Sequence, residues 1–154
     1  MRKGSLVRRW VQDYGITRSN EIQAVLAPRG VERVLRDLVS EDMLYAVTGS
    51  AAQRVYLPPE TTPVAPLSLL TVFTPDAGDA QELLKLRPAD RSANLLLVEP
   101  FDDVVFRNTV FREDIRYAAP SQTVADLLSG PGRSAEEGEQ LIGVLADPDS
   151  EWAL

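Results

Sequence analysis

The sequence is predicted to form an α+β fold, in which a helical N-terminal segment packs on a mixed sheet with flanking helices. Two observations indicate this class. Apolar residues recur with helical spacing through residues 1–44, and short, continuous apolar runs bounded by turn residues follow after residue 45. We therefore expect a helical segment over 1–44 and an α+β domain over 45–154, which can together form one continuous domain.

Three helices are expected in the N-terminal segment. The first ends at Gly15, and its apolar positions follow the helical period: Leu6, Val7, Trp10, Val11 and Tyr14. The second is predicted to begin after a cap at Thr17 or Ser19 and to stop at Pro28. Its apolar face consists of Ile22, Val25 and Leu26. The third spans 30–43 and places on one stripe the residues Val31, Val34, Leu35, Leu38 and Val39.

The sheet is expected to take its strands from four apolar runs. "LYAVTG" is a short run that stops at Gly49, and "LSLLTVF" is continuously apolar, as in a strand covered on both faces. "NLLLVEPF" and "DVVFRNTVF" are further strands, and "IRYAAPS" leads into a helix. The stretch "VYLPPETTPVAP" is rich in proline and is predicted to be extended or irregular.

Three helices are expected in the C-terminal part. "PDAGDAQELLKL" begins with Thr74 as its N-cap and Pro75 in its first turn. "PSQTVADLLSGPGR" is a short helix closed by a Gly-Pro-Gly turn. The last helix opens with Ser134 and Glu137, which have the spacing of a capping box, in which each side chain binds a backbone N–H of the other residue.

The composition excludes several classes of site. The chain has no cysteine and no histidine, which excludes disulfides, zinc fingers, thiol nucleophiles and Ser-His-Asp catalysis. No apolar run approaches the roughly 20 residues of a membrane span, and the basic start is followed by charge instead of an apolar signal core. We expect a cytoplasmic protein with no membrane partner and no cofactor.

Charge is distributed unevenly along the chain. The net charge of −7 argues against the whole chain as a nucleic-acid binder. Residues 1–54 nevertheless carry nine Lys or Arg and six Asp or Glu, whereas residues 55–154 carry seven and seventeen. A basic front half and an acidic back half indicate different roles, although scattered surface charge explains the same counts.

One interpretation of residues 16–59 is a winged helix that reads DNA. Residues 30–43 would be the recognition helix in the major groove, and a hairpin over about 45–57 would be the wing. The candidate DNA-binding side chains are Arg18, Asn20, Arg29, Arg33, Arg36, Gln53 and Arg54. The alternative is an amphipathic helix that packs on the core with its arginines solvated.

A second interpretation starts from the turn at Gly49 and Ser50, where a strand ends and small residues begin a helix. Nucleotidyltransferase folds use such a turn because small residues let backbone amides approach a triphosphate, and a following strand carries two carboxylates for Mg²⁺. The next buried strand has Thr71 and Phe73 in that place. The pattern predicts a degenerate nucleotide-site turn without metal ligands.

A third hypothesis is a metal-dependent nucleotidyltransferase that uses a carboxylate cluster at the end of a strand. The cluster consists of Glu99, Asp102 and Asp103. Because Pro100 and the paired aspartates are more typical of a turn between strands, this hypothesis is the least favoured of the three.

Five segments together resemble a known family: "WVQDYGITRSN", "LAPRGVERVLRDL", "YAVTGSAA", "LLLVEPFDDVVF" and "YAAPSQTVADLLSGPGR". In this order they are similar to the C-terminal region of AbiEi-type antitoxins of type IV toxin-antitoxin systems and of related actinobacterial transcriptional regulators. The resemblance implies regulation without turnover, a cognate nucleotidyltransferase toxin as partner, and DNA binding through a winged-helix domain that family members place before this region. We expect that this chain lacks that domain, so that only its basic front half offers a DNA surface.

The sequence therefore predicts a non-enzymatic regulatory domain with a degenerate nucleotidyltransferase-like core, acting by protein or DNA contact. A self-contained winged-helix regulator is the first alternative. The two hypotheses differ at residues 45–50, which form an interior strand with a tight bend in the first and one arm of an exposed hairpin in the second.

Overall fold

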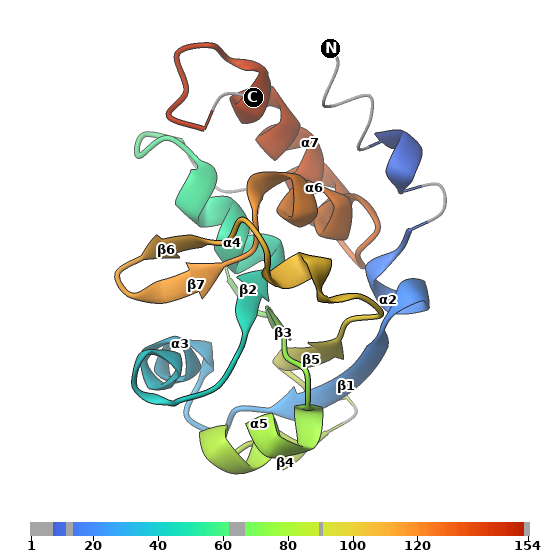
Figure 1. Ribbon diagram of the computed structural model, residues 1–154, viewed down its shortest axis with the longest axis vertical. Helices are drawn as coiled ribbons and strands as arrows, with labels where there is room; N and C mark the ends of the chain where they lie inside the picture. The colour runs from blue at the N-terminus through green and yellow to red at the C-terminus, as the bar shows by residue number, and fades with distance from the viewer. Residues whose placement is uncertain (1–7, 12–13, 62–66, 90, 153–154) are drawn as a thin grey trace.

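The structure, a computed structural model, describes residues 8–11, 14–61, 67–89 and 91–152. It is α+β, as predicted, and its described part contains one seven-stranded mixed sheet (Figure 1). The strands are β1 (Glu21–Leu26), β2 (Ala46–Thr48), β3 (Leu70–Phe73), β4 (Arg87–Pro88), β5 (Leu95–Glu99), β6 (Val110–Arg112) and β7 (Ile115–Tyr117). The helices are α2 (Ile16–Ser19), α3 (Val31–Ser40), α4 (Gly49–Tyr56), α5 (Ala77–Leu84), the 3₁₀ helix η1 (Asp103–Phe106), α6 (Pro120–Leu128) and α7 (Ser134–Ala146). Within the described residues, none of the helices has the length and apolar composition needed to cross a bilayer.

The strand order of the sheet is β4-β1-β5-β3-β2-β7-β6. β3 runs parallel to β5 and antiparallel to β2, β2 runs parallel to β7, and the remaining pairs are antiparallel. All residues of β2 and β3 are buried, because both strands lie inside the sheet. This burial explains why the two segments are continuously apolar instead of alternating.

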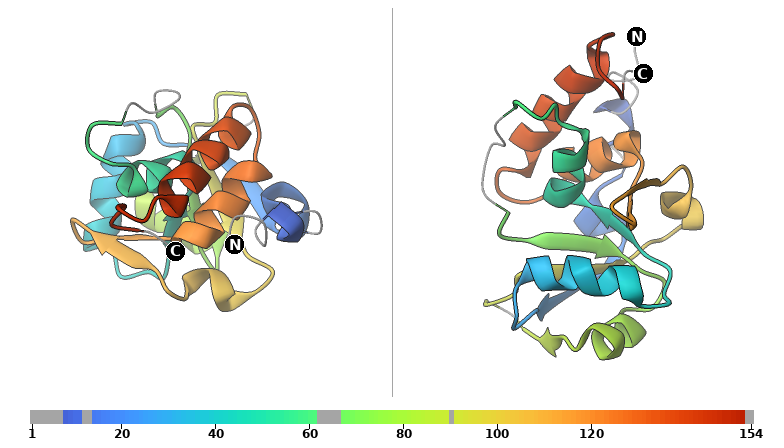
Figure 2. Two further views of the ribbon diagram at one scale, coloured as in Figure 1. Left: turned by 90° about the horizontal axis from the view of Figure 1, so that it is seen from above. Right: turned by 90° about the vertical axis from the view of Figure 1, so that its left-hand side faces the viewer.

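Two groups of buried side chains hold the helices to the sheet. The larger group includes Leu38 of α3, Tyr56 of α4 and Leu141 of α7, and the smaller group includes Phe73 and Val98. α4, α6 and α7 stack at one end of the molecule, and α3 and α5 lie at the other (Figures 1 and 2). The turn between β2 and α4 therefore lies where the sheet meets the stacked helices.

Several predicted elements are confirmed. The helix expected over 30–43 is α3, and the runs "LYAVTG", "LSLLTVF" and "NLLLVEPF" contain β2, β3 and β5. "PSQTVADLLSGPGR" contains α6, which has Pro120 in its first turn. Residues 57–61 are irregular as expected, whereas residues 55 and 56 continue α4, and residues 62–66 lie outside the described residues.

The helix predicted between Thr17 and Pro28 is wrong. Its first residues form the short α2, and the rest form β1, which pairs with β5 from Glu21 to Val25 and with β4 at Val25 and Leu26. Hydrogen bonds to strands far along the chain decide this conformation over a local apolar pattern that fits a helix equally well. Of the helix predicted to end at Gly15, residues 8–10 are helical and residues 1–7 and 12–13 lie outside the described residues.

The strand predicted from the run "DVVFRNTVF" is wrong in its first half. The Asp102 side chain accepts a hydrogen bond from the Val104 N–H at 2.9 Å and thereby caps η1. β6 begins only at Val110. A short polar side chain that binds the backbone two residues ahead favours a turn over an extended strand.

The helix predicted from Thr74 begins two residues later than expected. Asp76 is the N-cap of α5, and its carboxylate accepts a hydrogen bond from the Asp79 N–H at 3.0 Å. The Thr74 N–H instead donates to the Val98 carbonyl and so extends the pairing of β3 with β5. Pro75 connects the strand to the cap.

Candidate functional site

The turn after β2 is an interior bend, as the sequence predicts. Gly49 is buried and has a φ of +69°, in the left-handed region that favours glycine. A Cβ atom placed on Gly49 would lie 3.5 Å from Thr71 Oγ1, so the bend packs directly against β3. Ser50 follows as the second residue of α4.

A hollow of about 400 Å³, open to solvent, lies beside this turn. We call it the turn hollow, and it is bounded by α2, by Gly49 and Ser50, by Thr71 of β3 and by the end of α6 with the turn after it. Asp126 of α6 also lines it. The turn hollow thus occupies the place where the nucleotidyltransferase-like interpretation puts a nucleotide.

Asp126 is the most strongly perturbed carboxyl group among the described residues, and sequence reasoning did not single it out. Its two oxygens accept hydrogen bonds from Tyr14 Oη at 2.6 Å, Gln122 Nε2 at 3.0 Å and Thr48 Oγ1 at 2.5 Å. Burial raises the pKa of Asp126 to about 7, against the lowering effect of these three donors. The carboxyl group therefore joins α6 to β2 and to the segment before α2.

The strand that faces the turn carries no carboxylate. Thr71 reaches the turn hollow, whereas Phe73, two residues further along β3, is fully buried in the smaller core group. Alternate residues of a strand share a face, so these are the two positions at which a nucleotidyltransferase-like fold would present its metal ligands. One hydroxyl and one phenyl ring do not form a site for Mg²⁺.

The capping box predicted for the last helix is wrong. Arg133 is the N-cap of α7 and makes no side-chain capping bond. The Glu137 carboxylate instead accepts a hydrogen bond from Ser50 Oγ at 2.6 Å, and Glu137 is only 3% exposed. The Gln53 amide donates to Gln140 Oε1 at 2.7 Å, which adds a second link between α4 and α7. The Gly49-Ser50 turn is consequently fixed to the last helix.

The wing predicted over residues 45–57 is also wrong. Residues 46–48 form the interior strand β2, and residues 49–56 form α4, so this stretch is no hairpin. Gln53, a proposed wing residue, is completely buried, and Arg54 lies on the same helix. A helix fixed between α6 and α7 cannot enter a DNA groove as a wing does.

Two other candidate DNA-binding residues hold the N-terminal segment in place. Arg18 donates to the backbone carbonyls of Val11 and Tyr14 at 2.9 and 3.0 Å. The Asn20 amide donates to the Ile16 carbonyl, and its oxygen accepts from the Phe101 N–H at 3.0 Å. Their polar atoms are directed at the protein itself.

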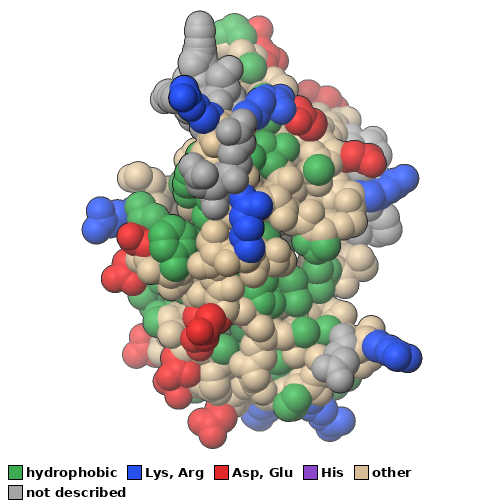
Figure 3. Space-filling view, turned by 90° about the vertical axis from the view of Figure 1, so that its right-hand side faces the viewer, with side chains coloured by type: hydrophobic (Ala, Val, Ile, Leu, Met, Phe, Trp, Pro, Cys, Tyr) green, Lys and Arg blue, Asp and Glu red, His purple; other side chains and the backbone are tan. Residues whose placement is uncertain are grey.

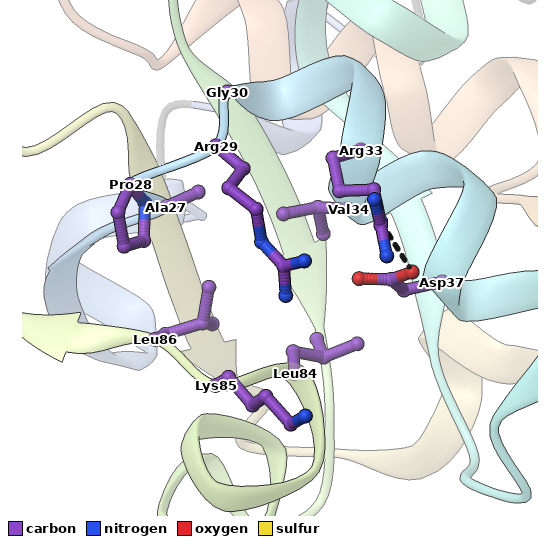
Figure 4. Close-up of a pocket in the computed structure, with 10 residues that line it drawn as sticks. All are labelled: Ala27, Pro28, Arg29, Gly30, Arg33, Val34, Asp37, Leu84, Lys85 and Leu86. Atoms are coloured by element: carbon purple, nitrogen blue, oxygen red, sulfur yellow. Dashed lines mark hydrogen bonds and ion pairs between the residues drawn. The ribbon is translucent and has the colours of Figure 1, made fainter.

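Two of the three remaining candidates border a second hollow, of about 210 Å³, between the start of α3 and the end of α5 (Figure 4). We call it the basic pocket. Arg29 and Arg33 line it, and they are joined by Lys85, which sequence reasoning missed. Lys85 is the C-cap of α5 with a φ of +55°, and this local geometry sets the direction of its side chain. Arg36 is exposed on α3 and does not line the pocket.

The charges of the basic pocket are only partly balanced. Arg33 Nε lies 3.1 Å from Asp37 Oδ1, one turn further along α3. Arg29 and Lys85 form no ion pair within the part of the chain that the structure describes. Figure 4 shows the Arg29 side chain reaching from the loop across the pocket, above Lys85 on the α5 side.

The carboxylate cluster at the end of β5 is engaged in local structure. Glu99 Oε2 accepts the Ala77 N–H at 2.8 Å and so supports the start of α5, and Asp102 caps η1. Asp103 is exposed within η1. Over the described ranges of the chain, no three Asp, Glu, His or Cys side chains gather as metal ligands would.

Comparison of the chain with models of known protein families, with curated proteins and with solved structures finds no match. The geometry of the turn hollow and of the basic pocket therefore carries the functional argument.

Proposed function

We propose that this chain is a non-enzymatic regulatory domain that acts by contact with a protein partner, as its resemblance to the C-terminal region of AbiEi-type antitoxins implies. The observation that carries the proposal is the composition of the turn hollow. It lies beside the tight turn from β2 into α4, as a nucleotide does in a nucleotidyltransferase-like site, but the facing strand β3 has Thr71 in the hollow and Phe73 in the core where that site needs metal-binding carboxylates.

The polar groups around the turn also favour a structural role over catalysis. Ser50 donates to Glu137, and both oxygens of Asp126 accept hydrogen bonds from neighbouring side chains. A catalytic carboxylate has to be within reach of a substrate proton or a metal ion. The carboxylates of Glu137 and Asp126 instead accept hydrogen bonds from other side chains of the protein. The arrangement supports a structural role for these groups, which is consistent with a degenerate nucleotidyltransferase-like core.

An exposed aromatic surface is the place where we expect the partner to bind. It consists of Trp10 and Phe101, with the Tyr14 ring between them at 4.7 Å from the first and 6.2 Å from the second. Phe101 is 62% exposed, and aromatic side chains of this kind dominate protein interfaces. Figure 3 views the side where α2 lies and shows hydrophobic side chains at the surface among basic and acidic ones.

Co-expression with a nucleotidyltransferase toxin encoded beside this chain tests the proposal. The pair should co-purify, and Phe101→Ser should weaken capture about tenfold or more, as loss of an interface anchor does. Phe111→Ser is the matched control, because Phe111 is 58% exposed but lies on β6. Equal loss in both variants, or no capture by the unaltered chain, contradicts the proposal.

A second experiment addresses the enzyme hypothesis directly. Mg²⁺ with a nucleoside triphosphate, present at a hundred times the dissociation constant, would stabilise a competent site by about 2.7 kcal/mol. We expect an unchanged melting curve and no nucleotidyl transfer. A nucleotide-dependent rise in the melting temperature that requires Mg²⁺ would refute the non-enzymatic assignment.

DNA contact is the second candidate function, and one observation favours it. Arg29, in the loop before α3, and Arg36, on α3, are exposed in the basic front half of the chain. Binding to duplex DNA that weakens in Arg36→Ala, with a flatter dependence on salt, would support it.

A further inference from the structure

We propose that the basic pocket binds a single phosphoryl group, either inorganic phosphate or the phosphate monoester of a small molecule. The proposal does not depend on the partner assigned above, because the basic pocket uses none of the residues of the turn hollow or the aromatic surface.

The first argument is that three positively charged side chains converge on the basic pocket. Arg29, Arg33 and Lys85 come from two segments separated by about fifty residues, and the fold places all three on one small hollow. Two of these cations have no acidic partner within the residues that the structure describes. Like charges that are held together repel one another, and an anion bound between them removes that cost.

The chemistry of the basic pocket matches a phosphoryl group. The hollow is open to solvent, so an anion can reach the three cations from the surface. Its lining also includes the buried apolar side chains Val34, Leu84 and Leu86. Arg29 can bind two phosphate oxygens with its planar fork, and Lys85 supplies a point charge from the opposite side.

The surrounding charge favours a compact dianion over a nucleic acid. Glu32 in the first turn of α3 and Glu82 in the last turn of α5 are exposed on the two helices that flank the basic pocket. The whole chain carries a net charge of −7. The repeated phosphates of a duplex would meet these carboxylates, whereas one phosphoryl group meets the three convergent cations and a single carboxylate, Asp37, which is paired with Arg33.

Calorimetric titration of the full chain at low salt tests the proposal. The probes are inorganic phosphate, adenosine monophosphate, adenosine, and a DNA duplex whose ends carry no phosphate. We expect phosphate or the monophosphate to bind and adenosine not to bind, with the two phosphate probes showing whether the free ion or a monoester is preferred. Absence of binding by both phosphate probes, or tighter binding of the duplex than of either, overturns the proposal.

Three variants locate the binding. Lys85→Gln and Arg29→Gln should each weaken the phosphate probes about tenfold, since each removes one charged contact. Arg36→Gln removes a charge from the same helix but outside the basic pocket, and it should leave the affinity within about twofold. These side chains are exposed, so melting temperatures should stay unchanged and show that the variants are folded. Equal weakening in all three variants would mean a diffuse charge effect and would overturn the assigned site.

Discussion

The turn hollow and the basic pocket differ in whether their polar side chains have partners within the protein. At the turn hollow, the Asp126 carboxyl group is buried and receives three hydrogen bonds from side chains of the same chain. At the basic pocket, Arg29 and Lys85 lie at the surface without an acidic partner in the described part of the chain. Groups that satisfy one another hold a fold together, whereas charges that converge without a partner can bind a ligand. The hydrogen-bond and ion-pair partners of the polar atoms in a site therefore indicate its function better than the position of the site in the fold.

Removal of the Asp126 carboxyl group should have the largest effect on stability. Asp126→Ala leaves the hydroxyl groups of Tyr14 and Thr48 and the Gln122 amide without their shared acceptor in a buried space. We expect a loss of about 3–5 kcal/mol in the free energy of unfolding, measured by urea denaturation. A loss below about 1 kcal/mol would show that the network contributes little to stability.

The pH dependence of stability should reveal the same group. Burial raises the pKa of Asp126 in the folded protein to about 7 from an ordinary value of 3.8. Between these values the folded chain binds more protons than the unfolded chain, so the contribution of Asp126 is complete below about pH 4 and is lost as the pH rises towards 7. The loss is on the order of 1.4 kcal/mol for each unit by which the folded pKa exceeds the unfolded one.

Asp126→Asn isolates this contribution from those of the other carboxyl groups. Arg8 holds the pKa of Glu139 below its ordinary value, and this ion pair contributes with the opposite sign as the pH falls. The difference in unfolding free energy between the unaltered chain and Asp126→Asn should therefore shrink as the pH rises from 4 to 7. A difference that is constant over this range would show that Asp126 is ionised throughout.

The sequence predicted the turn but not its network, for a physical reason. Gly49 is recognisable because a strand that ends in small residues needs a tight bend, which is a local property. Asp126 forms its hydrogen bonds with Tyr14 and Thr48, which lie 112 and 78 residues away in the sequence. A lone aspartate in an amphipathic helix is normally exposed, so the pattern around Asp126 contained no signal of its burial.

The error at β1 has the same origin. Ile22 and Val25 are spaced as on a helix, and hydrogen bonds to β5, 70 or more residues further along, make the segment a strand. Two residues of the basic pocket, Arg29 just before α3 and Arg33 within it, were singled out from the sequence, but as candidates for DNA contact. Lys85 was missed because only the packing of α5 against α3 brings it to the same hollow.

An intermediate effect is expected from the backbone of the turn itself. Gly49→Ala places an L side chain at a φ of +69°, and this should cost about 1–2 kcal/mol in unfolding free energy. Gly132→Ala is the matched control, because Gly132 has a φ of +62° and open space around it. The 3.5 Å approach of the new Cβ to Thr71 is an ordinary contact, so the two losses should be similar. A much larger loss at Gly49 would mean that the turn hollow has no room even for a methyl group.

The smallest effect on stability, and the sharpest test of the basic pocket, should come from Asp37→Asn. Asp37 is the acidic partner of Arg33, and the pair is partly exposed on one face of α3, so its loss should change the unfolding free energy by less than about 0.5 kcal/mol. The same change frees Arg33 and removes a negative charge from the basic pocket, so the affinity for phosphate should rise about threefold or more in calorimetric titration. At the turn hollow, loss of a carboxylate destabilises the fold, whereas at the basic pocket it should improve binding. If the phosphate affinity of Asp37→Asn falls or stays constant, Arg33 does not contact the ligand. The contrast between the paired groups of the turn hollow and the unpaired cations of the basic pocket would then not extend to Arg33.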